Sequence, residues 1–474
     1  GTMKKAIKRG LKDEGILPGG LNVQKKAKQL YSIEHVDESQ MTHENRLVSA
    51  YAFAATTWHV DQVTGDDDAA KLDSTGATPY RHLQVAIDRA KNGDTILVGD
   101  GEYGAEEGVT EDTNGRSRIR VDRTLTLKSL HGAAKTSIVG AFDDTANHLG
   151  PNAVRCISAK ASSGGTTVID GFTFKNGASG GEYNTAGRSG GVYGYGATVY
   201  VIGCVVTNCC SYDYACYNVN LIGCRIEDCV AYKEAIALQS NAGNNTTAFT
   251  LFARNRGENG PSGMQIARGA DINIVNCTFV GNDSASDVYV SDSLAGNLRN
   301  CLFSASAANS VSVKKDCGSY LTSADCLTDD QGGQPLFAPF FGDYRVRPNG
   351  PADNAANEEH LDLIKLPEGY ALADIRDPYG NPIDTTNLHL GAIQELSETP
   401  ACGALQVSAK TKIGTVVTPV SSYFFSSDYP VQYVAEAQLE NGETLFGFKT
   451  SAVGSWRFPR PGSNSVLLMP SPNV

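Results

Sequence analysis

Apolar and polar residues alternate in short segments from residue 57 onward, as they do along β-strands, and Gly, Asn, Asp and Ser fill the breaks between the segments. The segments 58–61 and 95–98 are predicted as strands of this kind. Between them, Leu83, Ala86, Ile87 and Ala90 fall at i, i+3, i+4 and i+7, which predicts one short amphipathic helix ended by residues 92–94. Such a helix is suited to cap the open end of a stack of strands.

One short phrase recurs along the chain: Gly or Asn, then Cys or Phe, a variable residue and an apolar residue. It occurs within 169–174, 202–206, 222–226, 275–279 and 298–303, and its Gly or Asn positions are 32, 20, 53 and 24 residues apart. The spacing of 53 is close to two turns with a loop. A second phrase, at 211–216 and again at 231–236, gives each turn at least one further strand. A strand recurring every ~20 residues predicts an all-β parallel solenoid.

The twelve cysteines follow this repeat. Cys204, Cys224, Cys277 and Cys301 share one inward position, and Cys209 and Cys229 share another, so stacked turns would align them as small buried side chains. No pair forms a CxxC motif, which disfavours zinc. Two interpretations stay open: reduced packing residues, or one or two disulfides that join Cys209 or Cys210 to a neighbour and Cys317 to Cys326.

Composition divides the chain into three parts. Residues 1–56 form a leader, and within 4–50 it holds nine Lys or Arg and six Asp or Glu. Two interpretations stay open: the leader is a polar segment, helical or flexible, or it is a docking arm. Residues 57–395 hold the repeat, and residues 396–474 form short strands separated by turns, a spacer or a module for attachment or sugar binding. The net charge of −12 disfavours a nucleic acid as partner, and no apolar run is long enough to span a membrane.

Residues 57–395 resemble the right-handed parallel β-helix proteins of the pectin-lyase-like type. The resemblance rests on 58–61, 65–67, 78–81, 86–87, 92–98 and 101–103 at the start of the repeat and on 343–352, 377–382 and 390–393 at its end. It implies a right-handed parallel β-helix with an N-terminal capping helix and a small C-terminal β domain. That superfamily holds polysaccharide lyases, glycoside hydrolases, epimerases, adhesins and phage tailspikes. Residues 446–448 and 466–470 resemble internalin-type repeat modules.

A column of charged and aromatic side chains is the candidate site. Asp213 and Lys233 occupy one slot in successive turns, and Tyr212 and Tyr232 lie beside them. Abstraction of the proton next to a uronate carboxylate needs a base and a cation that neutralises the acid. We therefore predict Lys233, Arg254 and Glu234 as catalytic residues, with Lys233 as the base. The predicted substrate-binding residues are Arg188, Tyr212, Asp213, Tyr232, Arg256 and Glu258. A solvated ladder of mixed charges is the alternative.

The acidic run Asp66, Asp67 and Asp68 could hold Ca²⁺ through carboxylate oxygens, and a solvated acidic loop is the alternative. The motif set of the superfamily's hydrolases is absent from the sequence. We expect a secreted or cell-surface protein that interacts with a polysaccharide or surface glycan, with lyase or hydrolase as the candidate activities. The competing hypothesis is a non-catalytic adhesin or appendage subunit. The sequence pattern does not indicate an oligomeric state.

Overall fold

The computed structural model describes residues 55–396 and the strands between 402 and 468. Within 55–396 the undescribed gaps are 113–114, 160–164, 181–187, 196–197, 234, 240–245, 259–261, 268–271, 284–286, 292–294, 305–313, 316–319, 329–334 and 339–342. The predicted leader therefore lies outside the described residues. For 402–468 only the backbone elements are described.

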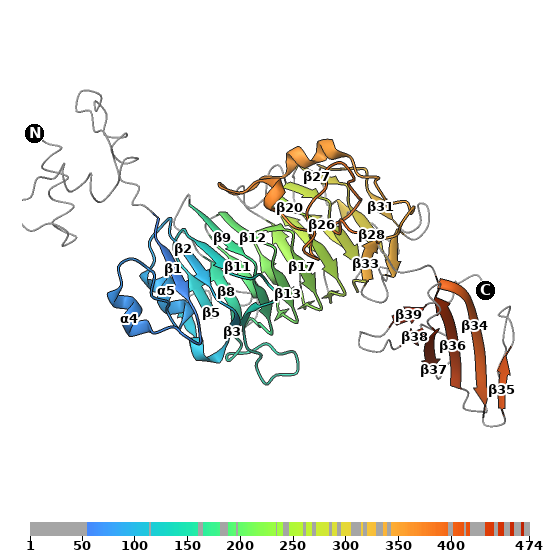
Figure 1. Ribbon diagram of the computed structural model, residues 1–474, viewed down its shortest axis with the longest axis horizontal. Helices are drawn as coiled ribbons and strands as arrows, with labels where there is room; N and C mark the ends of the chain where they lie inside the picture. Colours follow the sequence, from blue (N-terminus) through green and yellow to red (C-terminus); the bar gives the residue numbers. More distant parts are fainter. Residues whose placement is uncertain are drawn as a thin grey trace, which may run out of the picture.

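The chain folds as a right-handed parallel β-helix whose turns stack three long sheets, as predicted (Figure 1). Sheet 1 contains β1 (Thr57–Val60), β2 (Thr95–Val98), β6 (Thr126–Ser129), β9 (Thr166–Asp170), β12 (Thr198–Ile202), β16 (Asn220–Ile222), β20 (Thr246–Ala248), β24 (Ile272–Val275), β27 (Ala295–Arg299) and β30 (Tyr320–Ala324). Sheet 2 contains β3 (Gly101–Tyr103), β7 (Thr136–Val139), β10 (Thr173–Lys175), β13 (Val205–Thr207), β17 (Arg225–Glu227), β21 (Leu251–Ala253), β25 (Thr278–Val280), β28 (Leu302–Ser304) and β31 (Leu327–Thr328).

Sheet 3 contains β4 (Thr110–Asp112), β5 (Gly115–Val121), β8 (Arg155–Ala159), β11 (Ser189–Gly194), β15 (Tyr214–Tyr217), β19 (Ala237–Gln239), β23 (Met264–Ala267), β26 (Val288–Ser291) and β29 (Lys314–Lys315). All neighbours in the three sheets pair in parallel except β4, which pairs antiparallel with β5. A short sheet 4, made of β14 (Cys210–Ser211), β18 (Val230–Ala231) and β22 (Arg256–Gly257), bridges sheets 2 and 3 in three turns.

The repeated phrase marks the corner between sheets 1 and 2. The residue at this corner takes a left-handed backbone conformation in turn after turn, a region that Gly and Asn adopt at low cost. The corner residues are Gly171, Gly203, Gly223, Phe249, Asn276, Asn300 and Asp325, with φ between 46° and 78°. The interval of 53 residues between Gly223 and Asn276 contains one further corner, at Phe249. The next residue, Thr250, takes the inward position that Cys occupies in other turns. At the corner between sheets 2 and 4, one residue per turn takes the same left-handed conformation: Asn176, Asn208, Asp228, Arg254 and Gly281.

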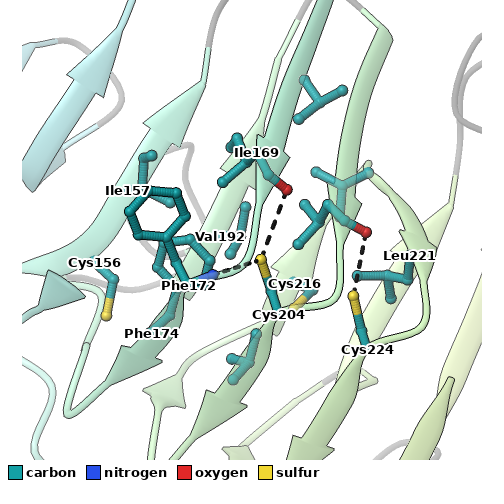
Figure 2. Close-up of a cluster of buried hydrophobic side chains, with 14 of the residues drawn as sticks. Cys156, Ile157, Ile169, Phe172, Phe174, Val192, Cys204, Cys216, Leu221 and Cys224 are labelled. Carbon is teal, nitrogen blue, oxygen red and sulfur yellow. Dashed lines mark hydrogen bonds between the residues drawn. The ribbon is translucent and has the colours of Figure 1, made fainter. Parts of the chain in front are cut away.

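The residue after each corner points into the helix and builds the core. Figure 2 shows Phe172, Cys204 and Cys224 in successive turns, where the two thiols hydrogen-bond to backbone carbonyls. Phe252, Phe279 and Phe303 stack inside sheet 2 with ring centres 4.9 Å apart. Ten cysteines are described; all ten are free thiols, and all but Cys326 are buried. This confirms the predicted inward columns, whereas Cys317 and the Cys402 side chain lie outside what the structure describes.

A helix closes the first turn, as predicted. Helix α5 (Leu83–Arg89) buries Leu83, Ala86 and Ile87, and it lacks a capping side chain of its own at its first residue. The carboxylate of Glu107, from the short helix η2 (Ala105–Glu107), accepts the backbone N–H groups of Leu83 and Gln84 at 3.0 Å instead. A carboxylate at a helix N-terminus satisfies free N–H groups and complements the helix dipole. Helix α4 (Asp67–Leu72) precedes α5.

The segment 343–396, which we call the exit segment, runs back along the outside of the helix. It follows β32 (Leu336–Ala338), begins with β33 (Asp343–Val346) and includes the short helices η6 (Glu358–Leu363) and η7 (Leu372–Asp374). Its apolar side chains cover outward residues of sheets 1 and 2: Ile375 packs on Tyr200 and Ile222, and Tyr344 packs in a cluster with Leu302. The Tyr370 hydroxyl donates to Asp170 at 2.9 Å. The outer corner of sheets 1 and 2 is therefore occupied by the chain itself.

An antiparallel sheet follows the β-helix. Its strands are β34 (Cys402–Thr411), β35 (Gly414–Val417), β36 (Gln432–Leu439), β37 (Thr444–Lys449), β38 (Trp456–Phe458) and β39 (Val466–Leu468). The short strands predicted within 396–474 are therefore confirmed for the part of this segment that the structure describes.

Candidate functional site

Sheet 3 carries a row of tyrosines on its outer surface. Parallel pairing places Tyr193 next to Tyr217, then Leu238, Gln265 and Tyr289 in successive turns. Their neighbours Val192, Cys216, Ala237, Met264 and Val288 are buried in the core, so alternation places Tyr193, Tyr217, Gln265 and Tyr289 on the outer face of the sheet. We call Tyr193, Tyr217, Tyr214, Gln265 and Tyr289 the tyrosine row.

The rings of the row contact one another along the helix axis. The ring centres of Tyr193 and Tyr217 are 5.1 Å apart at an interplanar angle of 18°. The Tyr214 ring lies 5.6 Å from that of Tyr217, and its hydroxyl donates to the side-chain oxygen of Gln265 at 3.0 Å. Tyr214 thereby connects the turn of β15 to the turn of β23. Tyr193, Tyr214 and Gln265 are buried, and Tyr217 and Tyr289 are half-buried. The side chain of Tyr195, stacked on Tyr193, is exposed.

Two arginines lie against the row. The Arg155 guanidinium is 4.7 Å from the centre of the Tyr193 ring, and that of Arg188 is 5.1 Å from the centre of the Tyr217 ring. Arg188 also donates to the Tyr217 hydroxyl at 2.8 Å. Because this oxygen accepts from Arg188, its own proton is directed to a different acceptor. Burial raises the pKa of Tyr193 to about 12, so that this phenol stays protonated and can only donate or accept as a neutral group.

The predicted column is present at the sheet 3 side of sheet 4. Ser211 pairs with Ala231 and Ala231 with Gly257, which brings the following residues, Tyr212, Tyr232 and Glu258, into one line. Lys233 donates its backbone N–H to the Tyr212 carbonyl at 2.8 Å, and its ammonium lies 5.6 Å from the Tyr212 ring centre. Tyr212 and Tyr232 pack partly into an apolar cluster with Cys210 and Val230.

The charged members of the column differ in exposure. Asp213 is buried, whereas Arg256 is exposed and pairs with Glu258 at 3.1 Å. Arg188 belongs to the tyrosine row, and the segment 212–217 joins that row to the column. Glu234, a predicted catalytic residue, lies outside the described residues. The column therefore brings together Tyr212, Tyr232, Lys233 and Glu258, with Arg188 one turn earlier.

Arg254 is not brought to Lys233. It precedes β22, whereas Lys233 follows the neighbouring strand β18, so the two lie at opposite ends of sheet 4. The Arg254 guanidinium binds Asp228 at 2.9 and 2.7 Å, Glu227 at 3.0 Å and the Tyr344 hydroxyl. These partners, led by Asp228, raise the pKa of Arg254. The contacts give Arg254 a structural role, joining a corner of the helix to the exit segment.

The acidic run at 66–68 is engaged by the protein. The Asp66 side chain caps α4 by accepting from the N–H groups of residues 68 and 69, and Asp67 binds His82 at 2.6 Å. Asp68 is almost fully exposed and pairs with Lys71 at 3.5 Å. These contacts account for the run without an ion, and Ca²⁺ binding there stays a prediction. Across the described residues, no three His, Cys, Asp or Glu side chains converge as a metal site.

Sequence reasoning missed most of the tyrosine row. The second recurring phrase also fits 189–193 and 287–290, and these segments contain Tyr193 and Tyr289. Tyr214, Tyr217, Gln265 and Arg155 were not singled out. The signal that could have found Tyr217 and Gln265 is register counted from the buried residue of each strand, Cys216 or Met264, because the position of the row is the next residue. That signal does not reach Tyr214 or Arg155.

No helix in the described part of the chain is long and apolar enough to cross a membrane. A search of protein-family models, of curated protein sequences and of solved structures found no match to this chain.

Proposed function

We propose that the protein binds a polysaccharide along the tyrosine row of sheet 3. The observation that carries the proposal is the accessible end of the row, where the half-buried Tyr217 and the exposed Tyr195 both stack on the buried Tyr193 and the Arg188 guanidinium lies over the Tyr217 ring. Aromatic side chains offer an apolar face for sugar rings and a hydroxyl for hydrogen bonds, and Arg binds carboxylates and other oxygen acceptors with several donors. The exit segment covers the corner of sheets 1 and 2, which favours sheet 3 as the binding face.

The same proposal includes membership of the pectin-lyase-like type and a secreted or cell-surface location. Support comes from the three-sheet parallel helix with its capping helix and from the phrases at the two ends of the repeat. The alternative is a non-catalytic adhesin that uses the same face for contact.

Lyase activity is the second candidate function. Arg188 lies one turn before the segment 212–217 and Lys233 one turn after it, which supplies a cation and a base on the same side of the helix. β-Elimination needs such a pair, one group to take the proton and another to stabilise the developing charge on the carboxylate. Arg254 has no role in this proposed reaction, because its guanidinium forms an ion pair with Asp228 at the other end of sheet 4.

A polysaccharide panel, measured for binding and for cleavage with Ca²⁺ and with EDTA, tests both proposals. Tyr217→Ala should weaken binding ~3- to 10-fold, the value of one aromatic contact. Lys135→Ala, an exposed lysine on the turn before β7, is the control and should change nothing. Absorbance from unsaturated uronates, lost in Lys233→Ala, would establish a lyase. Cleavage without that absorbance would indicate a hydrolase, and binding without cleavage would favour the adhesin. Absence of binding across the panel would overturn the proposal.

A further inference from the structure

Two cysteines lie side by side at the end of sheet 2. Cys301 directly precedes β28 and Cys326 directly precedes β31, the last two strands of this sheet. Leu302 pairs with Leu327 in parallel, and the Leu327 N–H donates to the Cys301 carbonyl at 2.9 Å. The two cysteines are therefore neighbours across one strand interval of ~4.8 Å, which lies within the ~4.4–6.8 Å that usually separates the Cα atoms of disulfide-linked residues.

Both sulfur atoms occupy the same position relative to the backbone. Each sulfur lies close to the carbonyl oxygen two residues before it, at 3.2 Å for Cys301 and 3.4 Å for Cys326. Each also lies 3.6 Å from a carbonyl oxygen of the preceding turn, that of Ile274 for Cys301 and that of Leu298 for Cys326. Leu298 belongs to β27, three residues before Cys301. The Cys326 sulfur therefore points back toward the turn that carries Cys301.

Access distinguishes this pair from the other cysteines. Among the ten described cysteines only Cys326 is half-buried, and the others are buried. Residues 322–325, which lead into Cys326, are exposed. Cys204 and Cys224 stand in the same relation to each other in two inner turns, but their side chains are only 1% and 0% exposed. A dissolved oxidant can therefore reach Cys326, and through it Cys301, without reaching the inner pair.

We propose that Cys301 and Cys326, both free thiols in the structure, are a redox-active pair that a small-molecule disulfide converts into a protein disulfide. The Cys326 thiolate attacks one sulfur of the small disulfide, and one small thiolate leaves. The Cys301 thiolate then attacks the Cys326 sulfur of this mixed disulfide, which forms the Cys301–Cys326 bond and releases the second small thiolate. The two released thiolates take up the two protons that the cysteines lose, so one small disulfide is reduced while two protein thiols are oxidised.

The new bond joins the two turns that hold η6 of the exit segment. Asn300, which precedes Cys301, donates from its side chain to the Asn357 carbonyl at 2.9 Å. Asp325, which precedes Cys326, binds His360 at 2.7 Å. Oxidation should therefore slow amide hydrogen exchange of η6 at least ~2-fold. Unchanged exchange in the linked protein would overturn this consequence of the bond.

Oxidised glutathione, added to the reduced full-length protein, tests the inference. Contact with Cys301 and burial raise the pKa of Cys326, so the reaction is run at about pH 8.5 to increase the thiolate fraction. Both cysteines should become unreactive toward a thiol reagent and should occur together in one linked peptide pair of a non-reduced digest. The protease Asp-N cleaves before Asp325 and therefore separates Cys326 from Cys317. Dithiothreitol should restore both thiols.

Cys301→Ala is the decisive variant. Without the second thiol, Cys326 should retain one bound glutathione in the intact mass, whereas the wild-type protein should retain none there. Cys224→Ala, the matched control from the inner pair, should form the same link as the wild type. If Cys301→Ala does not fold, the peptide map of the wild type decides. A link between Cys317 and Cys326, oxidation of Cys204 and Cys224 at an equal rate, or no link at all would overturn the inference.

Discussion

Arg254 offers the sharpest test of how this protein divides structural from functional residues. Its backbone takes φ +53° at the corner between sheets 2 and 4, a conformation that costs a non-Gly residue ~1–2 kcal/mol, and Gly281 fills the same corner in the next turn at φ +59°. Replacement by Ala removes the side-chain contacts and keeps the backbone cost. Replacement by Gly removes the same contacts and relieves that cost.

The magnitudes follow from the contacts of Arg254. Its ion pairs with Asp228 and Glu227 are partly exposed, so they contribute ~1 kcal/mol or less to the free energy of unfolding. Its contact with the buried Tyr344 hydroxyl counts for more, because an unsatisfied buried hydroxyl costs ~1–3 kcal/mol. We expect Arg254→Ala to lower the free energy of unfolding by ~2–3 kcal/mol and Arg254→Gly by ~1 kcal/mol less than Ala.

Urea denaturation of the three proteins measures the order, and glycan binding measured on the same samples separates structure from function. The expected order of stability is wild type, then Arg254→Gly, then Arg254→Ala, with binding retained by both variants below the transition. Equal stability of the Gly and Ala variants would contradict the left-handed corner. Loss of binding or cleavage in a fully folded Arg254→Gly would refute the structural role and restore the predicted catalytic one.

Three further predictions concern the core and the exit segment. Phe279→Ala removes the central ring of the buried stack, so it should cost ~4 kcal/mol in urea denaturation, and Phe279→Leu clearly less; equal costs would argue against the stack. When the protein is unfolded without reductant, at least ten thiols per chain should react with a thiol reagent. The folded chain should react slowly, because burial raises the pKa of Cys210 and of Cys224 to about 12. Fewer than ten reactive thiols in the unfolded chain would reveal disulfides. Burial lowers the pKa of His389 below its ordinary 6.5, so the imidazole binds a proton more readily in the unfolded chain than in the folded one. The free energy of unfolding should therefore fall as the pH drops below ~6.5. His389→Asn should lessen that fall, and an unchanged pH profile would contradict the assignment.

The repeat was predictable because it is set by local backbone chemistry. A left-handed corner selects Gly or Asn, and the next residue must be small or apolar because it points into the core, which is why Gly203-Cys204 and Asn276-Cys277 stand out in the sequence. The turn at Phe249 escaped this reasoning since the surrounding fold imposes its conformation against the local preference. Its existence was inferred only from the spacing of its neighbours.

The candidate site was predictable only where turns have equal length. Tyr212 and Tyr232 are 20 residues apart with no loop between them, so their alignment could be read directly. Tyr217, Gln265 and Tyr289 are separated by loops of different lengths, and the row emerges only after each strand is placed in register. The course of the exit segment depends on contacts such as Tyr370 with Asp170, 200 residues apart, for which the sequence carries no local signal.

The location of the positive charge favours binding on sheet 3 over a general electrostatic attraction. The chain carries a net charge of −12, so an acidic glycan would be repelled by the molecule as a whole. Arg188 and Lys233 are nevertheless each placed over a tyrosine ring on the side of sheets 3 and 4. A cation held against an aromatic ring stays directed at a fixed place, which supplies short-range contacts without a basic surface. Affinity that rests on such contacts should fall little when the salt concentration rises from 50 to 500 mM, and a steep fall would indicate that long-range charge, not the tyrosine row, provides the binding.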